Sequence, residues 1–164
     1  MRLPPPKKAP EIVVSQPSSK SPRPAPPRLE DFPLRVPDLI RFGDLDRQGH
    51  VNNAVYSTYF ETGRVGIIYD ADVGLQVEGA TSVLARAEID YLKELRWPGT
   101  IEIGTGIAEI GRSSYVFGQA IFHEGTCAAR CRSTMVLIDR ATRRSCPLPP
   151  ELLARLERLK LTDA

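Results

Sequence analysis

The chain has 164 residues, a formal net charge of +2, and a composition that is 41% hydrophobic and 26% charged. A chain of this length fits one domain that can bury a core. The net charge is too small to indicate a nucleic-acid or a membrane partner, so neither is expected. The hydrophobic and charged fractions are ordinary for a globular protein.

Cysteines and histidines are few and widely separated in the chain. Cys127, Cys131 and Cys146 form no Cys-x-x-Cys pair, a pattern that indicates neither a disulfide framework nor a zinc site. A reducing cytoplasm is therefore the predicted location. His50 and His123 are the only histidines, so no metal site is expected. No apolar run is long enough to span a bilayer.

Residues 1–30 are predicted to be a tail, and residues 31–164 to be one folded domain. The segments "LPPPKKAP" and "QPSSKSPRPAPPR" are rich in Pro, Ser, Lys and Arg. Such a composition buries too little apolar surface to offset the entropy lost on ordering. We therefore expect a disordered extension; a proline-rich ligand for a partner domain is the alternative.

The first predicted elements are an extended segment and a helix. Residues 32–42 look extended, and Pro33 and Pro37 restrict this segment to a sheet edge or an irregular start. Apolar residues recur at intervals of three and four between residues 53 and 71, which predicts a helix. Asn52 or Asn53 is the expected N-cap, because a short side-chain carbonyl satisfies free amides of the first turn.

From about residue 80 the apolar pattern changes to a period of two. Four alternating segments end near residues 91, 107, 121 and 137, and the turn sequences "WPGT", "IGRSS" and "HEGT" separate them. Short turns indicate antiparallel hairpins. Residues 148–159 are predicted to close the chain as a short helix. The order of one helix followed by an antiparallel sheet predicts an α+β fold.

The polar chemistry is concentrated in "RFGDLDRQGHVNN", residues 41–53, directly before the predicted helix. The first turn of a helix presents unpaired N–H donors and a partial positive charge, which can hold a developing oxyanion. A carboxylate beside such donors can attack a carbonyl or activate water. Asp44 and Asp46 are the candidates, and Asp44 is expected to hold Arg41 or loop amides. No Gly-rich phosphate loop and no Gly-x-Ser-x-Gly nucleophile motif occurs.

The runs "DLDRQGHVNN" (44–53) and "YFETGR" (59–64) resemble the hotdog-fold thioesterases related to 4-hydroxybenzoyl-CoA thioesterase. The resemblance covers about residues 34–140, with weaker matches at "YLK" (91–93) and "GRSS" (111–114). It implies a hotdog fold, in which an antiparallel sheet wraps around one long central helix. It also implies that the protein is a hydrolase that cleaves acyl-CoA to a carboxylic acid and coenzyme A.

The resemblance also implies roles for the loop residues. Asp46 would act on the thioester as nucleophile or general base, and the backbone N–H of Asn53 would polarise the thioester carbonyl. The 4-hydroxybenzoyl enzyme lacks the His-Val-Asn-Asn sequence found here, so its aryl substrate does not carry over. The remaining residues would shape the loop and contact substrate: Gly49, His50, Val51 and Asn52.

Further candidate contacts lie outside the loop. Glu61 on the helix is a second candidate carboxylate, and an ion pair with Arg64 is the alternative. The residues that would contact the pantetheine or the phosphates are Arg112, Ser113 and Ser114, and a plain turn is the alternative. Gly63 stands where alanine is common in the family and would loosen the helix slightly.

The resemblance implies a homodimer with its sheets joined edge to edge, or a homotetramer, with each site borrowing residues from a second chain. No cofactor is expected, since coenzyme A is part of the substrate. The alternatives are a thioesterase that takes its acyl group from acyl carrier protein, and a non-catalytic protein that binds acyl thioesters. The Asp-and-His loop of hotdog hydratases is not found. The sequence leaves the acyl group undetermined.

Overall fold

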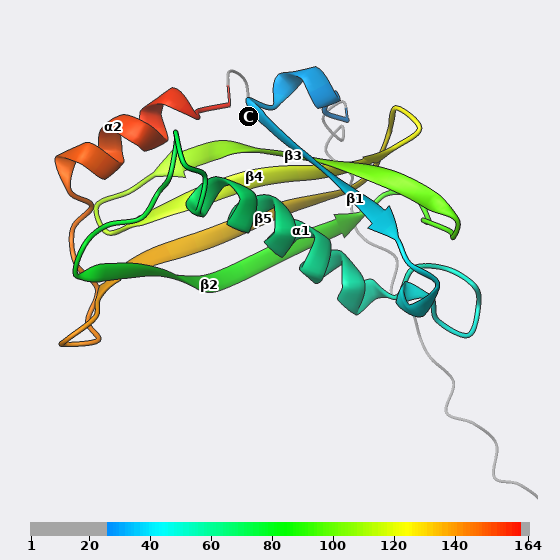
Figure 1. The fold of residues 1–164 in the computed structure, drawn as a ribbon, viewed down its shortest axis with the longest axis horizontal. Helices are drawn as coiled ribbons and strands as arrows, with labels where there is room; N and C mark the ends of the chain where they lie inside the picture. Colours follow the sequence, from blue (N-terminus) through cyan, green and yellow to red (C-terminus); the bar gives the residue numbers. More distant parts are fainter. Residues whose placement is uncertain (1–25, 162–164) are drawn as a thin grey trace, which may run out of the picture.

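The computed structural model describes residues 26–161 (Figure 1). Residues 1–25, which make up most of the predicted tail, lie outside this range. In the described part of the chain, no helix is both long and apolar enough to cross a membrane. The elements in chain order are η1 (Leu29–Asp31), β1 (Leu34–Ile40), η2 (Phe42–Asp44), α1 (Asn53–Ile68), β2 (Ala80–Tyr91), β3 (Gly99–Ile110), β4 (Ser114–His123), β5 (Thr126–Asp139) and α2 (Pro150–Arg158).

The strands form one antiparallel sheet of five strands in the order β1-β3-β4-β5-β2. β1 is an edge strand, as Pro37 predicts, and this proline lies opposite Glu102 of β3. β2 forms the other edge. The prediction of an α+β fold with an antiparallel sheet around one helix is confirmed, and Figure 1 shows α1 lying diagonally across one face of the sheet. We call this face the inner face.

The helix α1 begins and ends at identifiable polar groups. Asn52 is its N-cap, and the side-chain oxygen of Asn52 accepts a hydrogen bond from the N–H of Ala54 at 3.0 Å. The helix ends at Ile68, before the predicted end at residue 71. The Asp70 carboxylate accepts bonds from the N–H groups of Asp72 and Val73, at 2.9 and 2.8 Å. This side-chain turn replaces the next helical turn.

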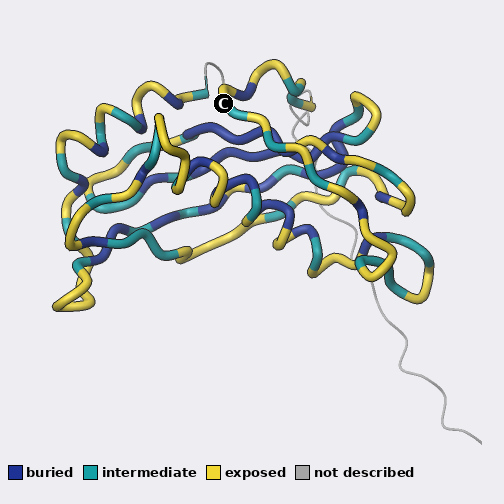
Figure 2. Tube along the Cα trace, in the orientation of Figure 1, coloured by how far each residue is buried: buried dark blue, intermediate teal, exposed yellow. Residues whose placement is uncertain are grey.

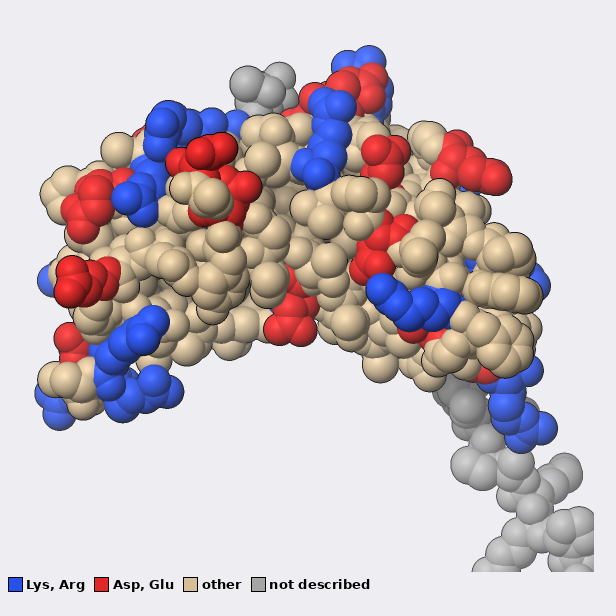
Figure 3. All heavy atoms as spheres, viewed as in Figure 1, with Lys and Arg blue, Asp and Glu red and all other residues tan. Residues whose placement is uncertain are grey.

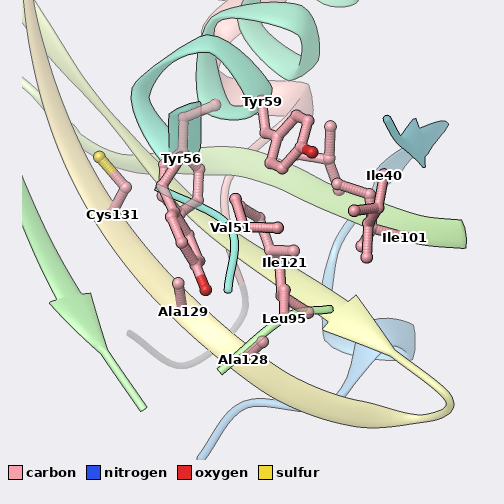
Figure 4. Close-up of a cluster of buried hydrophobic side chains, with 12 residues drawn as sticks. Ile40, Val51, Tyr56, Tyr59, Leu95, Ile101, Ile121, Ala128, Ala129 and Cys131 are labelled. Atoms are coloured by element: carbon pink, nitrogen blue, oxygen red, sulfur yellow. The ribbon is translucent and has the colours of Figure 1, made fainter. Parts of the chain in front are cut away.

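Buried side chains fill three clusters, and the central strands β3 and β4 are buried on both faces (Figure 2). The first cluster joins the N-terminal half of α1 to the inner face, through residues such as Tyr56, Tyr59 and Ile101 (Figure 4). The second cluster joins Ile67 of α1 to the apolar face of α2. The third covers the outer face, where Phe32 packs against Phe122. The core therefore fixes α1 against the sheet along its whole length.

The spacing of Cys127 and Cys131 predicts that both side chains lie on one face of a strand, and this prediction is wrong. Cys127 packs in the outer cluster, whereas Cys131 packs in the inner cluster beneath α1. A register shift between Ile121 and Phe122 makes Ala128 an extra residue in β5. Because an extra residue reverses the alternation of side chains, the cysteines point to opposite faces.

At Gly63, α1 approaches the sheet closely. A Cβ atom added there would lie 2.7 Å from Cγ2 of Ile103, 2.8 Å from Oγ1 of Thr105 and 2.9 Å from Nε2 of Gln119. The sequence predicts only a slight loosening of the helix at this glycine. Its main effect is instead to let the helix backbone rest directly on the side chains of β3 and β4.

We expect Gly63→Ala to lower the free energy of unfolding by up to about 2 kcal/mol, because an overpacking cost of about 1 to 3 kcal/mol outweighs a helix-propensity gain of about 1 kcal/mol. Urea unfolding measures the difference. Gly66→Ala in the same helix is the matched control, since its Cβ would meet only the Cγ2 methyl group of Val36, at 3.0 Å. A Gly63→Ala protein as stable as the Gly66→Ala protein would show that the helix does not need this close approach.

Candidate active site

The segment before α1 folds into a tight turn around Asp46. The Asp46 N–H donates to the carbonyl of His50 at 2.8 Å, and the Gly49 N–H donates to the carbonyl of Asp46 at 3.1 Å. Gly49 has a φ of +79°, a conformation that glycine adopts without strain. This agrees with the expectation that Gly49 shapes the loop. The turn brings the chain back toward the start of the helix.

The two oxygens of the Asp46 carboxylate have different environments. Oδ1 accepts hydrogen bonds from the N–H groups of Gln48, at 2.7 Å, and His50, at 3.3 Å. Within residues 26–161, no hydrogen bond involves Oδ2. The side chain is partly buried. One oxygen therefore holds the carboxylate in place, and the other remains available for chemistry.

Asp44 has a structural role that the sequence only suggested. Its Oδ2 accepts from the N–H of Arg41 at 2.7 Å and from the hydroxyl of Tyr59 at 2.6 Å. Its carbonyl accepts from the N–H of Asn52 at 2.9 Å. Tyr59 is fully buried in α1, and burial, followed by the bond to Asp44, raises the pKa of its hydroxyl. The expectation that Asp44 holds Arg41 and loop groups is confirmed.

The start of α1 presents the amide that the resemblance singles out. The N–H of Ala54 is capped by Asn52, and the N–H of Val55 donates to the Asn52 carbonyl at 2.9 Å. In the described part of the chain, the N–H of Asn53 donates to no acceptor. The hydroxyl of Tyr91, at the end of β2, donates to the carbonyl of Asn53 at 3.2 Å. Tyr91 belongs only to a weak motif in the sequence, yet it joins the edge strand to the helix start.

His50 lies beside two charged residues that the sequence did not single out. Its Nε2 is 3.1 Å from Oε2 of Glu94 and contacts Nη2 of Arg96. The same Arg96 nitrogen is 3.2 Å from the Glu94 carboxylate. These residues come from the segment that follows β2, and no motif marks them. A polar cluster of His50, Glu94 and Arg96 therefore borders the loop.

Val51 and Glu61 have contrasting environments. Val51 is buried in the first cluster, near Leu95 and Ile40 (Figure 4), and its N–H donates to the carbonyl of Leu95 at 2.9 Å. It anchors the loop in the core, and substrate contact by Val51 stays a prediction. Glu61 is exposed on α1. The alternative ion pair with Arg64 does not form, since Arg64 turns inward to Gln119 and Ser133.

Arg112, Ser113 and Ser114 lie far from the loop within one chain. They precede and begin β4, whereas Ile40, which leads to the loop, lies opposite Gly99 at the start of β3. Because β3 and β4 are antiparallel, these positions are at opposite ends of the sheet. One chain therefore brings Asp46, His50, Asn52 and Asn53 together, but not the segment 112–114.

The family model of the thioesterase-like superfamily matches residues 40–156, a range that includes the loop, α1, most of the sheet and most of α2. The chain belongs to this superfamily. The hotdog thioesterase fold is thereby confirmed, and thioester hydrolysis is the activity that the family supports. No group of three or more His, Cys, Asp or Glu residues in the range 26–161 is placed to hold a metal ion.

Solved structures with this thioesterase fold cover most of the chain. The PA5185 protein of Pseudomonas aeruginosa strain PAO1 is 28% identical with a TM-score of 0.75, over 84% of this chain and 99% of that one. A thioesterase of Thermus thermophilus, complexed with coenzyme A and Zn, is 34% identical with a TM-score of 0.69, over 79% and 96%. The proposed acyl-CoA thioesterase YneP of Bacillus subtilis (strain 168) is 25% identical, over 62% of this chain and 76% of its own length.

We expect Tyr59→Phe to lower the free energy of unfolding by about 1.5 to 3 kcal/mol, the range for a hydrogen bond to a charged group. Tyr115→Phe is the matched control, because the Tyr115 hydroxyl donates to the neutral Oγ of Ser82 at 2.9 Å. Tyr115→Phe should lower the free energy of unfolding by only about 0.5 to 1.5 kcal/mol. Urea unfolding of both variants gives the comparison. Equal losses would mean that the Tyr59 hydroxyl does not hold the loop through Asp44.

Proposed function

We propose that the protein hydrolyses acyl-CoA thioesters to carboxylic acids and coenzyme A. The observation that carries this proposal is the pairing of two groups at the start of α1. Asp46 has one carboxylate oxygen fixed by loop amides and one without a hydrogen bond, and the Asn53 N–H is unpaired within the described residues. The coenzyme A bound to the Thermus thermophilus thioesterase supports a CoA ester as the substrate.

Each group has a defined part in the reaction. The Asn53 N–H, at the positive end of the helix, donates to the thioester carbonyl oxygen and stabilises the negative charge that develops on it. Asp46 either attacks the carbonyl carbon or takes a proton from the water that attacks it. The carbon–sulfur bond breaks, and coenzyme A leaves as the thiolate, which then accepts a proton. In the nucleophilic route, water hydrolyses the resulting anhydride.

The loop must hold the Asp46 carboxylate in an orientation that aims it at the substrate. The bonds from the N–H groups of Gln48 and His50 fix one of its oxygens in place. The bonds of Asp44 to Arg41 and Tyr59 hold the other side of the loop. Asp44 therefore supports the site, while Asp46 performs the chemistry.

We further propose that two chains complete each site. β2 is an edge strand, so its outer backbone groups can pair with the β2 strand of a second copy. An antiparallel pair about a two-fold axis brings the start of one β2 to the end of the other. The end of β2 contacts Asn53 through Tyr91, and its start lies near Ser113 and Ser114 through the Tyr115–Ser82 bond. The second chain would thereby bring its Arg112 to the mouth of this site, where a guanidinium can bind a CoA phosphate.

Asp46→Asn should lower kcat by on the order of 10²- to 10⁴-fold, as expected for loss of a catalytic acid–base group. Free-thiol release from a panel of acyl-CoA esters measures the rate. Asp90→Asn is the control, because Asp90 is exposed and pairs with Arg130 on the outer face. Near wild-type turnover by Asp46→Asn on the best substrate would refute the proposed role of Asp46. Faster release from acyl carrier protein than from coenzyme A would change the donor but not the reaction.

Mixing two impaired variants tests the shared site. Asp46→Asn removes the catalytic carboxylate of one chain, and Arg112→Ala removes the phosphate contact that the chain gives to its partner. A hybrid dimer has one site with both defects and one site with neither. When the two variants are unfolded together and refolded as a mixture, hydrolysis should therefore rise above that of the two variants refolded separately. If activity stays at the level of the separate variants, the site does not use Arg112 of a second chain.

A further inference from the structure

Arg64 is a buried cation without a carboxylate partner in the described part of the chain. Its side chain projects from the fourth turn of α1 toward the sheet, and only 6% of the residue is exposed. Nη1 donates to Oε1 of Gln119 at 3.1 Å and to Oγ of Ser133 at 3.0 Å. Both acceptors are neutral. Desolvation by burial lowers the pKa of the Arg64 guanidinium.

The guanidinium is held rigidly by neighbours that are themselves fixed. Gln119 donates through Nε2 to the carbonyl of Phe60 at 2.9 Å and to Oγ1 of Thr105 at 3.1 Å. These bonds orient the amide so that its oxygen faces Arg64. An apolar side chain of similar size would avoid the desolvation of a charge. The stability of one chain therefore does not explain why an arginine occupies this position.

One side of the guanidinium has no partner among residues 26–161. No hydrogen bond involves Nε or Nη2 of Arg64, yet no buried side-chain nitrogen or oxygen in this range is without a hydrogen bond. These two nitrogens therefore retain access to solvent. The N–H groups of Nε and Nη2 point in the same direction from the planar group. This is the fork that a carboxylate binds through two parallel hydrogen bonds.

An apolar strip on the inner face leads from the start of α1 to this fork. α1 packs mainly against β1, β3 and β4, and much of the inner face of β2 stays exposed between its contacts with α1. The strip consists of Tyr91, Ile89, Ala87 and Leu84; Tyr91 is 48% and Leu84 is 49% exposed, Ala87 is exposed and Ile89 is half-buried. Figure 2 shows that the later part of β2 is largely exposed.

Two positions on the strip, Tyr91 and Ala87, match the two ends of a substrate. Tyr91 contacts Asn53, whose N–H is the proposed oxyanion donor, and Ala87 lies opposite Ser133, to which Arg64 donates. Ala87 and Tyr91 are four residues apart, which spans about 14 Å in an antiparallel strand. On the molecular face that contains α1, charged side chains gather mostly toward the margins, and the middle is largely uncharged (Figure 3). Arg64 therefore provides a cation at the far end of an apolar path.

We propose that Arg64 binds a carboxylate at the far end of the acyl group, so that the preferred substrates are mono-CoA thioesters of dicarboxylic acids. This inference rests on the proposed function. The methylene groups of the acyl chain lie along the strip, and the terminal carboxylate takes the fork of Nε and Nη2. The same strip accepts an unsubstituted chain, but such a chain leaves the Arg64 fork without a partner.

Octanoyl-CoA and suberoyl-CoA test this proposal, because their acyl chains have the same number of carbons and differ in the terminal carboxylate. The full-length protein should show a higher kcat/KM for suberoyl-CoA. Arg64→Gln should lower kcat/KM for suberoyl-CoA by about 10-fold or more, as expected for loss of a charge-assisted hydrogen bond, and should leave octanoyl-CoA nearly unchanged. Arg64→Lys keeps the positive charge but lacks the fork. Its kcat/KM for suberoyl-CoA should therefore lie between the values of the wild-type protein and of Arg64→Gln.

Arg132→Gln is the matched control, since Arg132 is exposed and pairs with Glu109 away from the inner face. A wild-type protein that hydrolyses octanoyl-CoA as well as suberoyl-CoA overturns the role of Arg64 but keeps the proposed function. Hydrolysis of no ester in the panel overturns the proposed function itself. Equal losses on both esters, with a lower Tm, make Arg64 a structural anchor only. If Arg64→Gln dissociates an oligomer, the fork binds a carboxylate of a second copy. Either of these last two results, equal losses or dissociation, overturns the proposal.

Discussion

The structure depends on the close crossing of α1 over the inner face of the sheet at Gly63. Because Gly63 has no side chain, the helix backbone rests on Ile103, Thr105 and Gln119. A bulkier residue would raise the helix and weaken the polar network between Arg64, Gln119 and Ser133. The Asn52 cap sets where the helix begins. The position of the Asn53 N–H in space therefore depends both on this cap and on the packing of α1 against the sheet.

The loop places its two aspartates in different environments, which suit them to different roles. Asp44 bonds to Arg41, to the buried Tyr59 and, through its carbonyl, to Asn52. Asp46 uses one oxygen to bind loop amides. This division follows from geometry: Asp44 lies where a helix side chain can reach it, whereas Asp46 lies at the turn that Gly49 makes. A carboxylate with a fixed orientation and a free oxygen is the form that acyl transfer requires.

The sheet separates features that we propose belong to one site. Segment 112–114 is at the far end from Asp46 in the same chain, while the open edge of β2 and its largely exposed strip lie beside the helix. An exposed apolar strip next to a buried cation is unusual for a surface that only faces water. The proposed second chain and the proposed dicarboxylic substrate each explain this surface. The substrate would bind the Arg64 fork, whereas the pairing of β2 strands does not require Arg64.

The sequence by itself determined the elements, the family and the position of the polar loop before α1. Periodicity placed α1 and the strands, Pro37 placed β1 at an edge, and the "DLDRQGHVNN" run identified the family, because these signals are local. Tertiary structure decided the rest. The face of Cys127 depended on a bulge, the partners of Arg64 came from β4 and β5, and Tyr91, Glu94 and Arg96 reached the loop from distant segments. Such contacts join residues that no spacing in the chain relates, so only packing of the sheet against the helix brings them together.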